Sequence, residues 1–295
     1  YIEMSSASGL VLLKEEERNC MFTSSFGTGE LIADAIQKGA TTINLFIGGS
    51  ATNDGGIGIA SALGYRFFDA CENLLSPIGQ NLLLINRIDD SEVLFKTKEV
   101  QVKVICDVNT LLYGKNGAAY IYGVQKGASS IEIEQLNQGL VNLSSKLLEH
   151  DLPNISDIPG AGAAGGVGGG AFAFLGAQLL SGIQNFIEIT QLETLIKECD
   201  LVITGEGKLD IQTEEGKVIS GVCQLAKKNK KPIIAVCGDV DLPISKSLEL
   251  KKVYTVLSKS KSVEEAIAKA AEKLVLIGHE IGVKFCKHAK KPSIQ

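Results

Sequence analysis

Several patterns that mark common types of active site are missing from this 295-residue sequence. No Gly-Lys-Ser/Thr triplet occurs, which excludes a Walker A loop. The seven cysteines are dispersed, and none forms a Cys-x-x-Cys pair or has a histidine at metal-ligand spacing, so neither zinc nor haem binding is predicted. Only three histidines are present, each in or beside a charged helical stretch, which argues against a nucleophilic triad.

A strong charge of either sign and a long run of large apolar residues are also lacking. The net charge of −5 argues against a nucleic-acid-binding protein, which normally carries a basic face. Residues 158–187 are uncharged, but they are rich in glycine and poor in large apolar side chains, so no membrane-spanning helix is predicted. An odd, dispersed set of cysteines is typical of reduced thiols, and no secretory signal is visible, so we expect a cytoplasmic protein.

Proline is scarce and glycine abundant, with 6 and 32 residues, so the glycines punctuate folded elements and do not mark a disordered segment. Strand-like apolar segments at 42–47, 100–106, 201–204, 232–237 and 253–256 alternate with helical patterns at 29–38, 131–148, 214–228 and 263–285. This alternation predicts an α/β fold with a mainly parallel sheet. At this length we expect two domains, residues 1–195 and residues 196–295.

The segment 45–58, LFIGGSATNDGGIG, combines the features of a binding loop. An apolar strand ends at Gly48 and Gly49, several polar groups follow, and a helical pattern begins at residue 57. Glycines let a backbone approach a ligand closely, and hydroxyl, amide and carboxylate groups in one turn offer both anion donors and a metal ligand. We therefore interpret residues 48–54 as a binding or catalytic turn; a tight structural turn is the alternative.

Two other loops place charged groups after predicted strands. Residues 205–210, GEGKLD, follow the strand 201–204, at the end of a strand where open α/β sheets bind ligands. Their carboxylates suit a metal, and the lysines at 208 and 217 suit phosphate oxygens; a capped, solvated turn is the alternative. Asp107 follows the strand 100–106 and suits a general base or a metal ligand, unless it only caps a turn.

Residues 160–165, GAGAAG, formally match the dinucleotide-binding pattern Gly-x-Gly-x-x-Gly. No strand is predicted before them, and no acidic residue follows at the expected distance, so a nicotinamide-dependent dehydrogenase is only weakly indicated. Close packing of a helix against another backbone, or against substrate, explains these glycines better. Glycine-rich and acidic loops with lysines and no nucleophile fit phosphoryl transfer, so the residues by themselves predict a magnesium-dependent small-molecule kinase.

Segments along nearly the whole chain resemble the type I glycerate kinases. They are IEMSSASGL at 2–10, SFGTGE at 25–30, residues 48–56, Cys106-Asp107-Val108, QKGA at 125–128, residues 159–166, ITGEG at 203–207, Asp210, Gln212-Thr213 and Gly216-Lys217. They occur in the order found in the family, and together they are specific, although no single one is.

The resemblance implies ATP-dependent phosphorylation of D-glycerate, typically to 2-phosphoglycerate, with Mg²⁺. It also implies an active cleft between a central α/β domain and a flavodoxin-like, parallel-sheet domain built from both chain ends. Carried onto this sequence, the catalytic candidates are Asp54, Asp107 and Asp210, and the metal ligands are Glu206 and Asp107. The candidates for binding substrate or phosphate are Gly48, Gly49, Ser50, Ala51, Thr52, Asn53, Lys126, Gly205, Gly207, Lys208 and Lys217.

Two departures from the family pattern motivate an alternative. Members of the family resemble one another in an earlier start, with an Asp-Ser-aromatic-Lys loop, so the flavodoxin-like domain is expected to lack its N-terminal part here. Lys208 stands where the family usually has arginine, and this exchange loses a planar bidentate donor. The alternative is a catalytically inactive homologue that binds glycerate or a nucleotide. A homodimer is compatible with either function.

Overall fold

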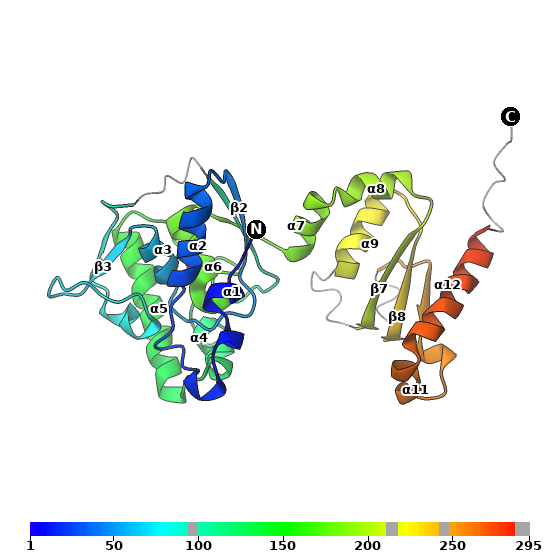
Figure 1. Ribbon diagram of the computed structural model, residues 1–295, viewed down its shortest axis with the longest axis horizontal. Helices are drawn as coiled ribbons and strands as arrows, with labels where there is room; N and C mark the ends of the chain where they lie inside the picture. Colours follow the sequence, from blue (N-terminus) through cyan, green and yellow to red (C-terminus); the bar gives the residue numbers. More distant parts are fainter. Residues whose placement is uncertain (94–99, 211–217, 242–247, 287–295) are drawn as a thin grey trace. The chain divides into compact units, whose positions relative to one another are not determined.

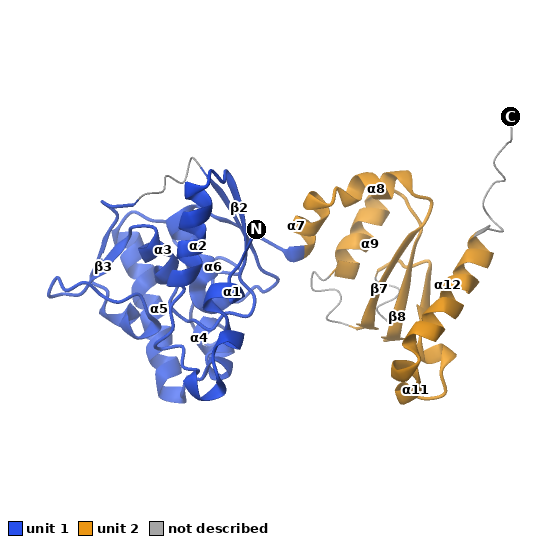
Figure 2. Cartoon of the chain, viewed as in Figure 1, with its two compact units in different colours: residues 1–182 blue, residues 183–295 orange. Residues whose placement is uncertain are grey.

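The structure is a computed structural model that describes residues 1–93, 100–210, 218–241 and 248–286. Contacts divide the chain into two compact units, Tyr1–Gly182 (unit 1) and Ile183–Gln295 (unit 2) (Figure 2). Both contain helices and a parallel sheet, which confirms the predicted α/β class. The domain boundary after residue 195 stays a prediction. Two helices before it, α7 (Gly182–Ile189) and α8 (Leu192–Glu198), contribute buried isoleucines to the core of unit 2.

Unit 1 is built on a parallel sheet in the order β1-β2-β5-β6 (Figure 1). Its strands are Ile2–Glu3, Thr42–Phe46, Gln101–Ile105 and Gln178–Leu180. Alternate residues such as Ile43 and Leu45 are buried, because successive side chains of a strand point to opposite faces of the sheet. The strands predicted at 42–47 and 100–106 are confirmed. A separate antiparallel pair joins β3 (Arg66–Phe68) and β4 (Arg87–Asp89).

Helices and short 3₁₀ turns connect and cover these strands. The helices are α1 (Ser5–Ser8), α2 (Phe26–Gln37), α3 (Ile57–Ala62), α4 (Ala118–Tyr122), α5 (Ser130–Glu149) and α6 (Ala163–Leu175). The 3₁₀ turns are η1 (Leu10–Leu12), η2 (Glu15–Glu17), η3 (Gly79–Leu84) and η4 (Val124–Lys126). The helices predicted at 29–38 and 131–148 are confirmed. The second begins earlier than predicted because Ser129 and Glu132 form a capping box, each side chain bonding the other's backbone N–H.

Unit 2 has three layers. The sheet has the order β7-β8-β9, from Val202–Leu209, Ile233–Val240 and Lys252–Thr255, and all its pairs are parallel. Helices α8 and α9 (Val218–Lys228) lie on one side, and α11 (Val263–Ala268) and α12 (Ala270–Cys286) on the other (Figure 1). A 3₁₀ turn, η6 (Leu257–Lys259), follows β9. The strands predicted at 201–204, 232–237 and 253–256 are confirmed.

Two predictions for unit 2 need correction. Strand β7 does not stop at residue 204, because its pairing with β8 continues to Leu209. The glycine at 205 therefore serves a close approach of two backbones, since a Cβ there would lie 2.3 Å from the carbonyl oxygen of Val236. The helix predicted at 263–285 is two helices, separated at Lys269. Of the helix predicted at 214–228, residues 214–217 lie outside the described residues.

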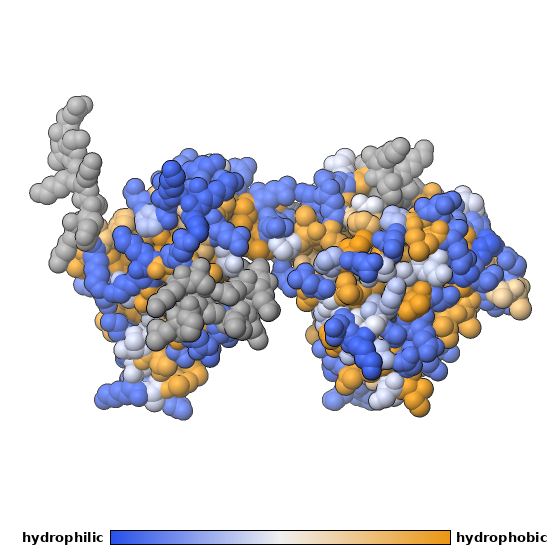
Figure 3. Space-filling model, turned by 180° about the vertical axis from the view of Figure 1, so that it is seen from behind, coloured by the Kyte–Doolittle hydropathy of each residue, from blue (hydrophilic) through white to orange (hydrophobic). Residues whose placement is uncertain are grey.

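Within the described part of the chain, no helix is both long and apolar enough to cross a membrane. On the face seen in Figure 3, apolar and polar side chains are interspersed over both units. Exposed apolar side chains occur on helices of each unit, for example Ile131 of α5 and Val275 of α12. Single exposed apolar residues of this kind are usual on protein surfaces.

Candidate active site

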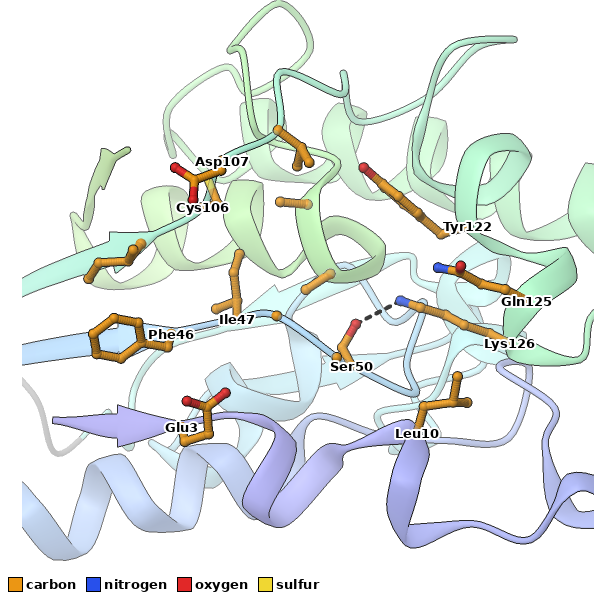
Figure 4. A pocket seen from close by; sticks show the side chains of 16 residues that line it. Glu3, Leu10, Phe46, Ile47, Ser50, Cys106, Asp107, Tyr122, Gln125 and Lys126 are labelled. Carbon is orange, nitrogen blue, oxygen red and sulfur yellow. Dashed lines mark hydrogen bonds between the residues drawn. The ribbon is translucent and has the colours of Figure 1, made fainter. Parts of the chain in front are cut away.

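A pocket of about 590 Å³ lies at the carboxyl ends of the parallel strands of unit 1. The turn after β2, the segment after β5, the end of α4 with η4, and the start of α6 form its walls. Figure 4 shows Lys126 pointing toward Ser50, with Asp107 farther along the wall beside Cys106. The pocket therefore brings together three predicted sites that are far apart in the sequence: Gly48 to Ser50, Asp107 and Lys126.

The turn between β2 and α3 is held at both ends. On its first side, the backbone N–H of Leu10 donates to Gly49 O, and the N–H of Ala51 donates to Ser8 O, each at 2.9 Å. On its second side, Gly55 adopts a φ of +61°, and a Cβ there would lie 2.4 Å from a methyl carbon of Leu143. A side chain at position 55 would be both strained and obstructed, so the turn requires glycine there.

Asp54 is fully buried beneath this turn. Its Oδ2 accepts hydrogen bonds from the backbone N and the Oγ of Ser25, both at 2.7 Å, and its Oδ1 accepts one from the backbone N of Gly56 at 3.1 Å. Burial raises the pKa of Asp54, while these hydrogen bonds act in the opposite direction. The geometry is that of a carboxylate that fixes the turn to the starts of α2 and α3. A catalytic role for Asp54 stays a prediction.

Lys126, at the end of η4, is a buried cation in the pocket wall, with only 3% of its surface exposed. Its Nζ donates to Ser50 Oγ and to Thr52 O, both at 2.7 Å. Among the residues that the structure describes, no carboxylate forms an ion pair with it. Burial lowers the pKa of Lys126 to about 8, although Cys20 and Asp54 act in the opposite direction. The ammonium group is thus held by neutral oxygens beside an open pocket.

Asp107 follows β5 and is exposed in the pocket wall. Its Oδ1 accepts a hydrogen bond of 2.6 Å from the backbone N of Gly182, the first residue of α7. The residue therefore takes the capping role that was the alternative for it, and it also faces the pocket. Its predicted catalytic and metal-binding roles stay predictions.

The start of α6 explains the glycine-rich segment at 160–166. Ala164, Gly165 and Gly166 all have a positive φ, and a Cβ at Gly165 would lie 2.0 Å from the carbonyl oxygen of Thr52. The predicted close packing of these glycines against another backbone is confirmed. Residues 151–162, all of them described, contain no strand, so the strand–turn–helix of a dinucleotide-binding loop is not formed.

The remaining predicted site residues belong to unit 2. Gly205, Glu206, Gly207 and Lys208 lie in β7, and Asp210 follows it. Glu206 and Gly207 line a second pocket, of about 550 Å³, together with Asp239. Lys208 Nζ lies 3.5 Å from Asp241 Oδ2, and both side chains are half exposed. Lys217 lies outside the described residues. A joint site of these residues with the pocket of unit 1 stays a prediction.

Some residues of the unit 1 pocket carry no role in the sequence-based prediction. They are Glu3 of β1, Tyr122 and Gln125 beside Lys126, and Ala163 and Ala164 at the start of α6. The signal that could have found them was present, because the family-like segments at 2–10 and 159–166 contain Glu3, Ala163 and Ala164. Neither segment has a side chain of obvious chemistry, apart from Glu3, and this is why no role was assigned.

The donor groups fit a magnesium ion that arrives with a phosphate ligand. Over the described ranges, no group of three or more His, Cys, Asp or Glu side chains is arranged to hold a metal. Magnesium commonly needs only one or two carboxylates, with phosphate oxygens and water as the other ligands. Asp107 offers an exposed carboxylate in unit 1, and Glu206 lies at the pocket of unit 2.

Comparisons with known proteins agree with this site. The sequence profile of the Glycerate kinase family matches residues 1–285. The glycerate 2-kinase of Escherichia coli K12 is 42% identical over 276 residues, which are 93% of this chain and 72% of the relative. The glycerate kinase of Halalkalibacterium halodurans is 39% identical over 284 residues, 96% of this chain and 75% of the relative. A crystal structure assigned to glycerate kinase 2 of Salmonella typhimurium LT2 has a TM-score of 0.76 at 37% identity, covering 95% of this chain and 76% of that one.

Proposed function

The chain belongs to the glycerate kinase family, and we propose that it transfers the γ-phosphoryl group of ATP to the 2-hydroxyl group of D-glycerate. That it is a glycerate kinase, with ATP as the donor, follows from the family. The choice of the 2-hydroxyl is supported by the name of the Escherichia coli relative, a glycerate 2-kinase. In this transfer the substrate oxygen forms a bond to the γ-phosphorus, the bond to ADP breaks, and the hydroxyl proton passes to a base.

One observation carries the proposal: the pocket of unit 1 has a buried ammonium group, that of Lys126, held only by neutral oxygens. A buried charge without a counter-ion is costly, and a bound carboxylate offsets that cost. D-glycerate has a carboxylate on the carbon that bears its 2-hydroxyl. An acid held by Lys126 therefore presents its 2-hydroxyl inside the same pocket.

The two aspartates of unit 1 suit different tasks. Asp107 is exposed in the pocket wall, where a carboxylate can take the proton of the attacking hydroxyl. Asp54 is fully buried and already accepts several hydrogen bonds, so we assign it to holding the turn rather than to proton transfer. Removal of Asp107 should then lower turnover, and removal of Asp54 should lower stability.

For unit 2 we propose contacts with ATP, in a cleft shared with unit 1. The support is chemical: the carboxyl ends of parallel strands are the usual ligand sites of open α/β sheets. Gly207 is exposed, and a Cβ there would meet no atom within 4 Å, so its backbone is open to a ligand. Gly205, Lys208, Asp210 and Lys217 complete the proposed set. Magnesium would neutralise charge on the transferred group, with Asp107 and Glu206 as its proposed ligands.

The test is ADP release from the purified chain with D-glycerate, ATP and Mg²⁺. We expect release only when all three are present, and ³¹P NMR should identify 2-phosphoglycerate as the product. Asp107→Asn should lower turnover by at least about a hundredfold, within the range for loss of a general base. Asp34→Asn is the matched control, because Asp34 is exposed on α2 and pairs only with Lys38 among the described residues.

Other outcomes have defined meanings. Formation of 3-phosphoglycerate would contradict the proposed position of transfer while leaving the kinase assignment intact. Binding of D-glycerate by calorimetry with no ADP release would favour the inactive homologue. Full turnover by Asp107→Asn would remove Asp107 from the mechanism.

We also propose a cytoplasmic location and a small-molecule substrate, with no nucleic-acid partner. Six cysteines of the described residues, among them the buried Cys20 and Cys223, are free thiols, which suits a reducing compartment. The homodimer stays a prediction, and light scattering after size exclusion is its test.

A further inference from the structure

Two adjacent residues of the turn after β2 contain polar atoms that nothing satisfies. In the described part of the chain, Oδ1 and Nδ2 of Asn53 and Oγ1 of Thr52 form no hydrogen bond, although both residues are completely buried. Buried polar groups are nearly always paired, because an unpaired one has left water without compensation. Such a defect in consecutive residues of a predicted binding turn indicates groups that are paired only when a ligand is present.

Both residues lie directly behind the pocket wall. The carbonyl oxygen of Thr52 is 2.7 Å from Nζ of Lys126, which lines the pocket. On the other side, a Cβ at Gly165 would lie 2.6 Å from the Cα of Asn53, and the neighbouring Ala164 also lines the pocket. The unpaired atoms are therefore separated from the pocket by one layer of side chains.

The first half of the turn has room to move, and its second half does not. Gly48 and Gly49 are exposed, and a Cβ at Gly48 would meet no atom within 4 Å. Asp54 and Gly55 are anchored by hydrogen bonds and close packing. Ser50, in the free half, is bonded to Lys126 Nζ at 2.7 Å, so an anion that binds the ammonium group competes with Ser50. Release of Ser50 would let residues 48–51 move and open the way to Thr52 and Asn53.

On the basis of the proposed function, we propose that Thr52 and Asn53 recognise the hydroxyl groups of the acceptor whose carboxylate Lys126 holds. An amide offers a donor and an acceptor, and a hydroxyl offers both, which matches the two hydroxyl groups of a short dihydroxy acid. Neither side chain suits a second anion better than it suits a hydroxyl group. An acid without hydroxyl groups leaves these atoms unpaired and binds weakly, so the pair sets specificity.

The first test uses the unmodified protein without ATP. Calorimetry compares D-glycerate with 2-hydroxypropanoate, 3-hydroxypropanoate and propanoate. We expect D-glycerate to bind at least about tenfold more tightly than propanoate, with each single hydroxyl recovering part of the difference. Equal affinities for all four acids would overturn the proposal. Because no turnover is measured, this failure is distinct from failure of the kinase assignment, which is read from ADP release.

The second test separates recognition from support of the fold. Asn53→Leu replaces atoms that form no hydrogen bond in the described structure, so the melting temperature should be unchanged or higher. D-glycerate affinity should fall about tenfold, and propanoate affinity should be unchanged. The control is Asn142→Leu, because Asn142 Nδ2 donates to Leu82 O and Ile85 O, both at 2.9 Å. This control should melt at a lower temperature and keep the discrimination between the two acids.

The opposite pattern has a clear meaning. If Asn53→Leu lowers the melting temperature as Asn142→Leu does, and the discrimination between D-glycerate and propanoate persists, then Asn53 supports the fold and the proposal is wrong. Thr52→Val, which removes a single unpaired oxygen with little change of shape, repeats the test if Asn53→Leu does not fold.

Discussion

In unit 1, the glycine- and acid-rich stretch after β2 forms a buried turn, whereas in unit 2 the similar stretch at 205–210 continues a strand. The carboxylate of Asp54 is completely buried and bonded to three backbone N–H groups and a hydroxyl. The lysine of unit 2, Lys208, is half exposed and lies 3.5 Å from an equally exposed aspartate. Charged groups thus have very different surroundings in two segments that look alike in the sequence.

This difference teaches where binding energy and stability are concentrated. Electrostatic interactions are strong where water is excluded and weak where it is not, so the same residue type has a large effect in unit 1 and a small one in unit 2. The variants below compare the two situations, beginning with the largest expected effect.

Lys126→Met should lower kcat/KM for D-glycerate by at least about thirtyfold, because it removes the proposed partner of the substrate carboxylate in a desolvated site. Steady-state kinetics at fixed ATP measures this. Lys38→Met is the control, since Lys38 is an exposed residue whose ion pair with Asp34 lies on the surface of α2. Equal kinetics in the two variants would contradict the assignment of Lys126.

Asp54→Asn should lower the free energy of unfolding by about 2–3 kcal/mol. The amide nitrogen of the new side chain faces N–H groups that now donate to a carboxylate, so buried donors lose their acceptor. Urea denaturation measures the change. A variant as stable as the wild type would show that the turn does not depend on this carboxylate.

The affinity for D-glycerate should fall as the pH rises above about 8, up to about tenfold per pH unit, because an anion needs the protonated form of Lys126. Calorimetry between pH 6.5 and 9.5 (about three units) tests this, and Lys126→Met should lose the dependence. The effect on stability has the opposite sign. The pKa in the folded protein, about 8, is below the ordinary 10.5, so the unfolded chain binds more protons in between, and stability rises with pH over that window.

Lys208→Met should change the free energy of unfolding by no more than about 0.5 kcal/mol, because its ion pair with Asp241 is half exposed and screened by water. Its proposed contact with phosphate should raise KM for ATP severalfold. The two readouts separate stability from binding: a large loss of stability would contradict the comparison between the units, and an unchanged KM would remove Lys208 from the ATP site.

Much of the fold could be predicted from the sequence because its signals are local. The apolar runs at 42–47 and 100–106 became β2 and β5, and the periodic segment at 131–148 became α5. Glycine was a less certain signal. At position 55 it permits a turn, but at 205 it permits close pairing of two strands, and the distinction depends on the neighbouring strand β8.

The site was predictable in its membership more than in its organisation. The turn at 48–54, Asp107 and Lys126 were candidates before any coordinates, and the first part of the turn shares a pocket with the other two. The burial of Asp54, the bond from Gly182 to Asp107 and the contribution of Glu3 could not be predicted. Each depends on segments that are distant in the sequence and adjacent only after folding.

The sequence by itself determined the α/β class, most helices and strands, and the family, because these depend on periodicity and on short motifs in a recognisable order. Only the tertiary structure decided which polar groups are buried, which of them are paired and which face the pocket. The physical reason is that the energy of a charge or a hydrogen bond depends on exclusion of water, and water is excluded by residues from many parts of the chain.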